Sequence, residues 1–152
     1  MRLAAADVSY AYVHGEEVLH GVSLSLVDGE VAFVLGANGS GKTTLLQCLS
    51  GVRQPTSGVV SVDGRALVQL TPRERARWIG VVPQLHEPAF AFTVTEAVLM
   101  GRAPHLGLFA RPGPDDQAIV DRALEAVGIL GMKHRPYTEI SGGEQQLVLI
   151  AR

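Results

Sequence analysis

The fold is decided by Gly36-Ala37-Asn38-Gly39-Ser40-Gly41-Lys42-Thr43-Thr44, which matches the pattern G-x-x-x-x-G-K-[ST] of a phosphate-binding loop. Its glycines leave successive backbone N–H groups free to converge on an anion, which a Cβ would obstruct. Lys42 carries a positive charge for the β- and γ-phosphates of a nucleotide, and the Thr43 hydroxyl is a ligand for Mg²⁺. The predicted phosphate site therefore comprises Gly36, Asn38, Gly39, Ser40, Gly41, Lys42, Thr43 and Thr44.

The residues on either side supply the strand and the helix that this pattern requires. Before the loop, Val31-Ala32-Phe33-Val34-Leu35 is a continuous apolar run, as expected of a strand buried on both faces. After it, apolar residues recur at helical spacing and Gly51 supplies a C-terminal stop. A glycine-rich turn without a ligand is the alternative, and this context favours the phosphate site.

Composition and charge narrow the functional classes. The chain has 152 residues, about one domain, and is 47% apolar and 18% charged. A mean hydropathy of +0.21 suggests surface meant for a partner. The net charge of −2 does not indicate a nucleic-acid partner. No apolar run approaches the roughly 20 residues that cross a bilayer, and the N-terminus lacks the apolar segment of a secretory signal. The single cysteine, Cys48, is interpreted as a core residue.

The pattern along the chain changes at about residue 84, from strands to helices. Antiparallel strands are predicted over residues 1–30 and further strands at 59–62 and 79–82. Helices are predicted to start at Thr71 and Thr93 and to cover residues 118–127, with a Pro/Gly-rich loop over 103–114. The five histidines show no ligand-like spacing, and the basic residues 73–78 are interpreted as a solvated helix face.

A second motif, Ser141-Gly142-Gly143-Glu144-Gln145, stands near the C-terminus. It predicts a capping box, with Ser141 as the N-cap and Glu144 three residues later. Such a cap is worth about 1 kcal/mol and needs no ligand. The paired glycines, however, remove side chains from the positive end of the helix dipole, which suits a phosphate.

Together the motifs resemble those of ABC-type ATPases, in that family's order and over essentially the whole chain. The phosphate loop is similar to the Walker A motif, Gln84 in Val81-Val82-Pro83-Gln84 to the Q-loop, and residues 141–145 to the signature motif. The resemblance implies an α/β P-loop NTPase core with an N-terminal antiparallel β-subdomain and a helical subdomain. It divides the chain at 1–84 and 85–152, as a partial nucleotide-binding domain.

The resemblance also implies roles for individual residues. Tyr12 is expected to stack on adenine, with Tyr10 or simple strand packing as alternatives. Gln84 is expected to touch Mg²⁺ and the attacking water, as a catalytic residue. The signature residues are expected to complete the nucleotide site of a second copy in an ATP-clamped homodimer: Ser141, Gly142, Gly143 and Glu144. ATP and Mg²⁺ are the implied cofactors.

A finer resemblance lies in Val98-Leu99-Met100-Gly101-Arg102-Ala103-Pro104-His105, which is similar to a segment in the ATPases of iron–siderophore, haem and cobalamin importers. In those proteins this region docks a helix of the transmembrane permease. The apolar Pro88-Ala89-Phe90-Ala91-Phe92 is expected to form part of the same groove. The implied function is an ATP-binding, energy-coupling importer subunit, peripheral on the cytoplasmic face of the inner membrane.

The chain departs from the family pattern after Leu149-Ile150-Ala151-Arg152. The Walker B carboxylates, the switch histidine and the C-terminal part of the core sheet are expected beyond this point. Loss of a general base costs about 10²–10⁴-fold in rate, so we expect this chain alone to hydrolyse ATP negligibly. Its uncovered strand at residues 31–35 is expected to promote aggregation. Leu147 stands where the family usually has arginine.

Three alternatives remain open at the sequence level. The first is a soluble ABC-type ATPase of DNA repair or translation, although under 100 residues separate Lys42 from Ser141 and no heptads intervene. The second is a P-loop kinase, which gives the Ser141 motif no purpose. The third is a truncated nucleotide binder that does not hydrolyse ATP.

Overall fold

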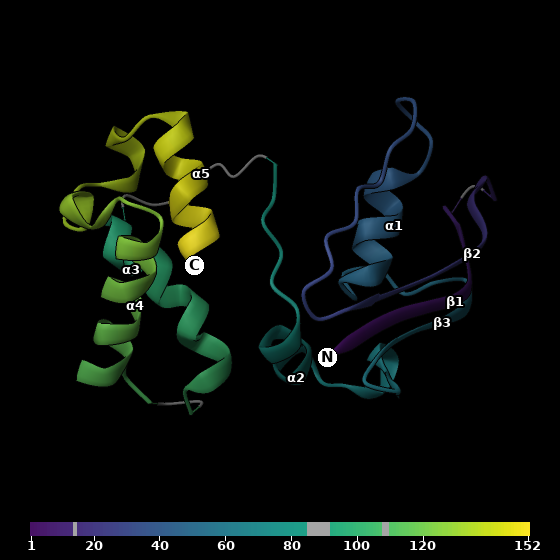
Figure 1. Cartoon of the computed structure of the whole chain (residues 1–152), viewed down its shortest axis with the longest axis horizontal. Helices are drawn as coiled ribbons and strands as arrows, with labels where there is room; N and C mark the ends of the chain where they lie inside the picture. Colours follow the sequence, from purple (N-terminus) through teal and green to yellow (C-terminus); the bar gives the residue numbers. More distant parts are fainter. Residues whose placement is uncertain (14, 85–91, 108–109) are drawn as a thin grey trace. The chain divides into compact units, whose positions relative to one another are not determined.

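The computed structural model describes residues 1–13, 15–84, 92–107 and 110–152, and it divides into two compact units (Figure 1). The first unit is Met1–Gly80 and the second is Val81–Arg152. Each unit has its own hydrophobic core.

The first unit is an antiparallel sheet covered by a helix. The strands β1 (Arg2–Ala11), β2 (Glu17–Val27), β3 (Ser57–Val62) and β4 (Arg65–Ala66) lie in the order β2-β1-β3-β4. The helices are α1 (Lys42–Leu49), the 3₁₀ turn η1 (Leu67–Gln69) and α2 (Pro72–Trp78). The predicted N-terminal antiparallel strands are thereby confirmed.

The core of this unit lies between the sheet and α1. Val8, Val62 and Cys48 are nearly inaccessible, and Leu45 and Leu49 of α1 join them. Burial raises the pKa of the Cys48 thiol. The interpretation of Cys48 as a core residue is therefore confirmed.

The predicted strand over residues 31–35 is wrong for this structure. Val31, Phe33 and Leu35 are 79%, 82% and 88% exposed, and the segment has no regular secondary structure. Among the described residues, the four strands pair only with one another. A strand forms only where a neighbour satisfies its backbone N–H and C=O groups. Residues 79–82 differ from the prediction in the same way, with Val81 and Val82 about half exposed.

The second unit is helical. Its α-helices are α3 (Val94–Leu99), α4 (Pro114–Ala126) and α5 (Gly142–Ala151), and its 3₁₀ turns are η2 (Met100–His105), η3 (Leu130–Met132) and η4 (Tyr137–Glu139). The three α-helices pack on one another (Figure 1). They enclose a core that includes Val94, Val120, Leu124 and Val148. The predicted helices are confirmed.

Helical structure in this unit extends further than predicted. The chain continues from α3 through η2 to His105, where the sequence predicts a loop from residue 103. Within this stretch Gly101 lies close to the backbone of Arg152, whose carbonyl a Cβ at position 101 would overlap. Of the apolar stretch 88–92, only Phe92 lies within the described residues. None of the described helices has the length and apolar character that crossing a bilayer requires.

Candidate functional site

The phosphate loop ends in a helix start that has no side-chain cap. Gly41, the N-cap of α1, is left-handed with φ of 86°, and no side chain caps the first turn. A Cβ on Gly41 would lie 3.0 Å from the carbonyl oxygen of Val18 and from a methyl group of Leu19. One on Gly36 would lie 2.6 Å from the Ser40 hydroxyl. The loop backbone therefore requires glycine at both positions and leaves the positive end of α1 open.

Lys42 lies inside this loop. Its ammonium group donates hydrogen bonds to the carbonyl oxygens of Gly36 at 2.8 Å and Ala37 at 2.6 Å. The Ser40 N–H closes a turn by donating to the Ala37 carbonyl at 3.2 Å. The remaining predicted loop residues, Asn38 and Gly39, are exposed. Backbone N–H groups of a glycine-rich loop and a lysine ammonium are the kinds of donor that a triphosphate needs.

The two threonines after Lys42 have different surroundings. Thr43 is exposed in the first turn of α1, where its hydroxyl is accessible to a Mg²⁺ ion. Thr44 is only 4% exposed, and its Oγ1 lies 3.1 Å from the hydroxyl of Tyr12. The loop residues thus fit a nucleotide with its metal, and Thr44 connects the loop to Tyr12.

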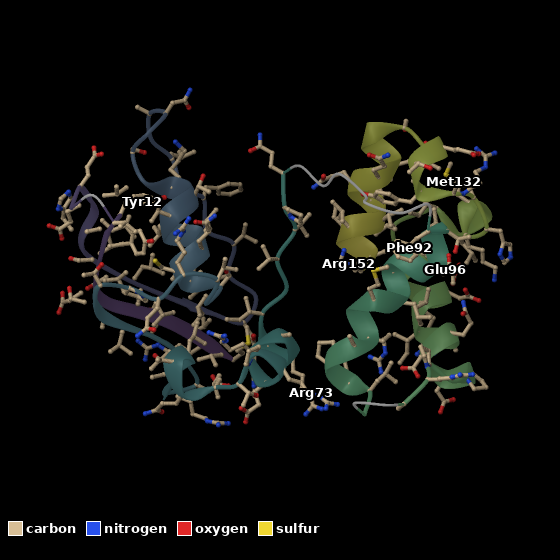
Figure 2. The ribbon with its side chains drawn as sticks, turned by 180° about the vertical axis from the view of Figure 1, so that it is seen from behind. Tyr12, Arg73, Phe92, Glu96, Met132 and Arg152 are labelled. Atoms are coloured by element: carbon tan, nitrogen blue, oxygen red, sulfur yellow. The ribbon has the colours of Figure 1, made fainter. Side chains whose placement is uncertain are left out.

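Tyr10 lies near the end of β1, and Tyr12 follows the strand and lies beside α1 (Figure 2). Tyr10 and Tyr12 meet edge to face, with ring centroids 5.1 Å apart and ring planes at 84°. Tyr10 is half-buried and its hydroxyl accepts a hydrogen bond from Arg53, whereas Tyr12 is 39% exposed. Tyr12 is therefore the more exposed of the two rings, and Tyr10 packs against it.

In the second unit, the predicted capping box at the start of α5 is present. The Ser141 hydroxyl accepts from the Glu144 N–H at 3.3 Å, and the Glu144 carboxylate accepts from the Ser141 N–H at 2.7 Å. Hydrogen bonding with the side chain of Ser141, and next with its backbone N–H, lowers the pKa of Glu144. Gly142 and Gly143 have open space where a Cβ would stand. The N-terminal end of α5 is therefore accessible at its glycines, and the Glu144 carboxylate lies in its first turn.

Gln84 follows Pro83 and is exposed. Gln146 of α5 donates to the carbonyl oxygen of Pro83 at 3.5 Å, which links the signature helix to the segment that carries Gln84. The importer-like segment 98–105 includes the exposed Met100 and the half-buried Arg102, which forms an ion pair with Asp116 at 2.9 Å. The phosphate loop and Tyr12 belong to the first unit, and Gln84 and the signature residues to the second.

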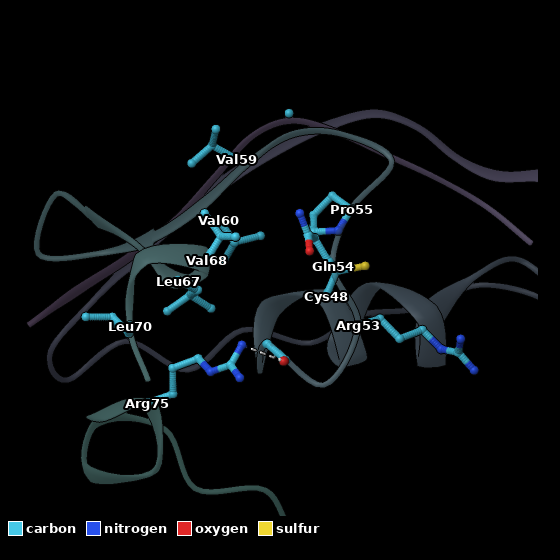
Figure 3. Close-up of a pocket in the computed structure, with 12 residues that line it drawn as sticks. Cys48, Arg53, Gln54, Pro55, Val59, Val60, Leu67, Val68, Leu70 and Arg75 are labelled. Atoms are coloured by element: carbon cyan, nitrogen blue, oxygen red, sulfur yellow. Dashed lines mark hydrogen bonds between the residues drawn. The ribbon is translucent and has the colours of Figure 1, made fainter. Parts of the chain in front are cut away.

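A cavity of about 310 Å³ lies in the first unit, between the end of α1, β3 and η1 (Figure 3). Its lining includes Cys48, Val60 and Leu67, and it contains none of the predicted site residues. Arg75 also lines it and donates to the Gly51 carbonyl at 3.1 Å. The predicted solvated face of residues 73–78 is therefore wrong for Arg75. The cavity has no part in the phosphate site.

Two contacts in these regions have no counterpart in the sequence analysis. One is the position of Arg53 against both tyrosine rings. The other is the bond from Gln146 to Pro83. Both contacts join residues more than 40 positions apart, so a local sequence pattern does not predict them. For Arg53, the sequence shows a basic residue just after the helix of the phosphate loop, but not which residues it contacts.

Comparison with known proteins gives a consistent family. A profile described as ABC transporter matches residues 19–152. The chain is 43% identical over 150 residues to the hemin import ATP-binding protein HmuV of Rhizobium meliloti (strain 1021), covering 99% of the chain and 55% of that protein. It is 42% identical over 139 residues to the cobalamin import ATP-binding protein BtuD of Halobacterium salinarum (strain ATCC 29341 / DSM 671 / R1), covering 91% and 34%. The chain thus spans about half the length, or less, of these curated relatives.

Solved structures agree with the expected fold class. CbiO1 from Clostridium perfringens, part of the ABC transporter complex CbiONQ, matches with a TM-score of 0.77 and 29% identity, covering 98% of this chain and 59% of that one. The dimeric bacterial ABC transporter cassette MJ0796 matches with a TM-score of 0.83 and 26% identity, covering 98% and 67%. The P-loop fold class and the family resemblance are both confirmed.

Proposed function

The chain belongs to the ABC transporter family, and from that premise we propose that its phosphate loop binds ATP for the energy-coupling subunit of a membrane importer. The observation that carries the proposal is the uncapped start of α1, with Lys42 enclosed by the loop. In the full-length protein the bound nucleotide is hydrolysed, and the resulting cycle drives substrate uptake.

Within the proposed nucleotide site, different residues bind different parts of the nucleotide. The amides of residues 36–41 and the ammonium of Lys42 bind the phosphates, and the Lys42 side chain exchanges its carbonyl partners for phosphate oxygens. The Thr43 hydroxyl would hold Mg²⁺, which would supply positive charge against that of the phosphates. Gln84, which belongs to the second unit, is proposed as a further ligand of this ion. The exposed ring of Tyr12 stacks on the adenine.

The signature residues act on the nucleotide of a second copy. Ser141, Gly142, Gly143 and Glu144 form an accessible helix start, and its N–H groups complete the γ-phosphate site across a homodimer interface. The dimeric structure of the MJ0796 cassette supports this arrangement. ATP then holds the dimer together, and hydrolysis releases it.

The relatives support the proposal of an importer and of a class of cargo. Two of them are named for hemin import and cobalamin import. We extend this class to iron–siderophores, since the segment 98–105 resembles those ATPases too. This segment and its exposed Met100 dock a transmembrane permease, which holds the subunit peripherally on the cytoplasmic face of the membrane. The DNA-repair and translation alternatives are not favoured by relatives named for import.

The test is a titration of the full-length protein with a fluorescent ATP analogue and Mg²⁺. Lys42→Ala is expected to weaken binding by about tenfold or more, because charge-assisted bonds to phosphate are worth about 1.5–3 kcal/mol. Lys133→Ala is the matched control, since the Lys133 ammonium forms an ion pair with Asp121 in the second unit. Equal affinities of the two variants would contradict the phosphate site. Co-purification with ribosomes, rather than with a polytopic membrane protein, would contradict the importer.

A further inference from the structure

Arg53 leaves the C-terminal end of α1 and is held in one orientation. Its backbone N–H donates to the carbonyl of Gln47 at 3.0 Å, and its Nε donates to the Gln47 side-chain oxygen at 2.6 Å. A terminal nitrogen of its guanidinium group donates to the Tyr10 hydroxyl at 2.8 Å. Figure 3 shows the side chain directed away from Leu67 and Leu70 of the cavity lining. Two directional bonds therefore fix the plane and the position of the guanidinium.

This fixed cation lies against both tyrosine rings. Its central carbon is 5.1 Å from the ring centroid of Tyr12 and 5.5 Å from that of Tyr10. Both distances are within the roughly 6 Å over which cation–π attraction acts. Since the two rings are perpendicular, one guanidinium restrains both of them at once.

Tyr12 is restrained from two more directions and remains accessible. Its hydroxyl contacts Thr44 of the phosphate loop at 3.1 Å, and its backbone N–H donates to Glu16 at 3.0 Å. It is nevertheless 39% exposed. An aromatic ring that is already fixed in position loses less conformational entropy when a base stacks on it.

We propose that Arg53 is a positioning residue for the nucleobase, which orients the Tyr12 ring through its guanidinium group. This inference rests on the proposed function, in which residues 36–44 bind the triphosphate and Tyr12 stacks on the adenine. Arg53 lies outside the phosphate loop, at residues 36–44, and two of its five N–H donors are held by Gln47 and Tyr10. Its effect therefore depends on the presence of a base and of the Tyr12 ring.

The experiment measures two probes on the full-length protein, ATP and inorganic tripolyphosphate, each by displacement of a fluorescent nucleotide. Arg53→Ala is expected to weaken ATP binding about threefold to tenfold, the size of a partly desolvated cation–π contact. Its affinity for tripolyphosphate is expected to stay within about twofold of wild type, because this probe has no base. Arg53→Lys, which keeps the charge but loses the planar fork, is expected to recover part of the ATP affinity.

A double-mutant cycle with Tyr12→Ala identifies the route of the effect. Tyr12→Ala is expected to weaken ATP binding by itself, and Arg53→Ala is expected to add nothing in that background. Equal losses for ATP and tripolyphosphate in Arg53→Ala would overturn the proposal, since they indicate a structural role only. So would an undiminished Arg53→Ala effect without the Tyr12 ring, or a Tyr12→Ala variant with unchanged ATP affinity. Failure of the proposed function has a different signature, namely tripolyphosphate affinity that Lys42→Ala leaves unchanged.

Discussion

Two helix starts in this chain have glycines at a position suited to a phosphate, and they differ in what already occupies them. At α1, Gly41 is left-handed, no side chain caps the first turn and no acidic residue stands in it. At α5, the Ser141 hydroxyl caps the helix and the carboxylate of Glu144 lies in the first turn. The positive end of the helix dipole is thus accessible at α1, whereas at α5 a carboxylate partly neutralises it.

The difference indicates an order of events for the proposed function. The open start of α1, with Lys42 beside it, is ready to bind an anion in a single copy. At α5 a phosphate has to approach a helix end that a carboxylate already stabilises. We therefore expect α5 to engage only after a second copy delivers a nucleotide that α1 has bound. The variants below test that distinction.

The largest expected effect comes from blocking the α5 start. Ser141→Arg in the full-length protein should leave ATP binding to the monomer unchanged and abolish ATP-driven dimerisation, since the long side chain fills the helix mouth. Sizing chromatography with ATP, in the absence of Mg²⁺ to limit hydrolysis, measures the dimer. Ser141→Thr is the control, because threonine also caps helices and should still dimerise. A dimer formed by Ser141→Arg would show that α5 takes no part.

A pair of glycine substitutions is expected to have the next largest effect. Gly41→Ala forces a side chain into the left-handed region, at about 1–2 kcal/mol, and brings its Cβ to 3.0 Å from Val18. It should weaken ATP binding about tenfold and lower the melting temperature. Gly142→Ala should change neither quantity, because its Cβ would meet no atom within 4 Å. If the two variants have equal ATP affinity in a titration, the shape of the α1 loop is not what binds the nucleotide.

The sequence predicted these helix starts well because their signals are local. Thr71, Thr93 and Ser141 each stand three residues before a glutamate, and all three capping boxes are present. The phosphate loop is predictable for the same reason, since its glycines and Lys42 are close together in the sequence. At each of these places, the residues that determine the backbone conformation lie within one turn of it.

The failed predictions involve partners that are distant in sequence. Residues 31–35 have the composition of a buried strand, but a strand depends on neighbours, and the described strands do not supply one. The inward turn of Arg75 depends on the Gly51 carbonyl, 24 residues away in sequence. The packing of Arg53 on Tyr10 and Tyr12 depends on α1 lying beside the end of β1. Periodicity carries no information on such contacts.

A smaller effect separates the capping role of Ser141 from its proposed role at the phosphate. Ser141→Ala should destabilise the full-length protein by about 1 kcal/mol, the usual value of a lost N-cap, and should also weaken ATP-driven dimerisation. Thr93→Ala removes an equivalent cap in the same unit and should cost a similar amount while sparing the dimer. Thermal unfolding and sizing chromatography measure the two effects. If the two variants dimerise equally well, Ser141 caps the helix and has no role at the phosphate.

The smallest expected effect concerns the Glu144 charge at the start of α5. Its pKa in the folded protein lies below the ordinary value of 4.5, because of hydrogen bonding with the side chain and then the backbone of Ser141. As the pH falls through 4.5, the unfolded chain therefore binds protons at this carboxyl before the folded protein does. The stabilisation that the carboxylate gives is fully present above pH 4.5 and is lost as the pH falls through the pKa of the folded protein.

Glu144→Gln isolates this charge, because glutamine still accepts from the Ser141 N–H in a capping box. Glu74 and Glu96 have lowered pKa values for a similar reason, but they titrate in both proteins and cancel from the difference. Urea unfolding should show wild type slightly more stable than Glu144→Gln at neutral pH, with the gap closing below pH 4.5. A gap that stays constant with pH would mean that the carboxylate does not neutralise α5. The contrast with the open start of α1 would then lose its electrostatic basis, and only the difference in capping would remain.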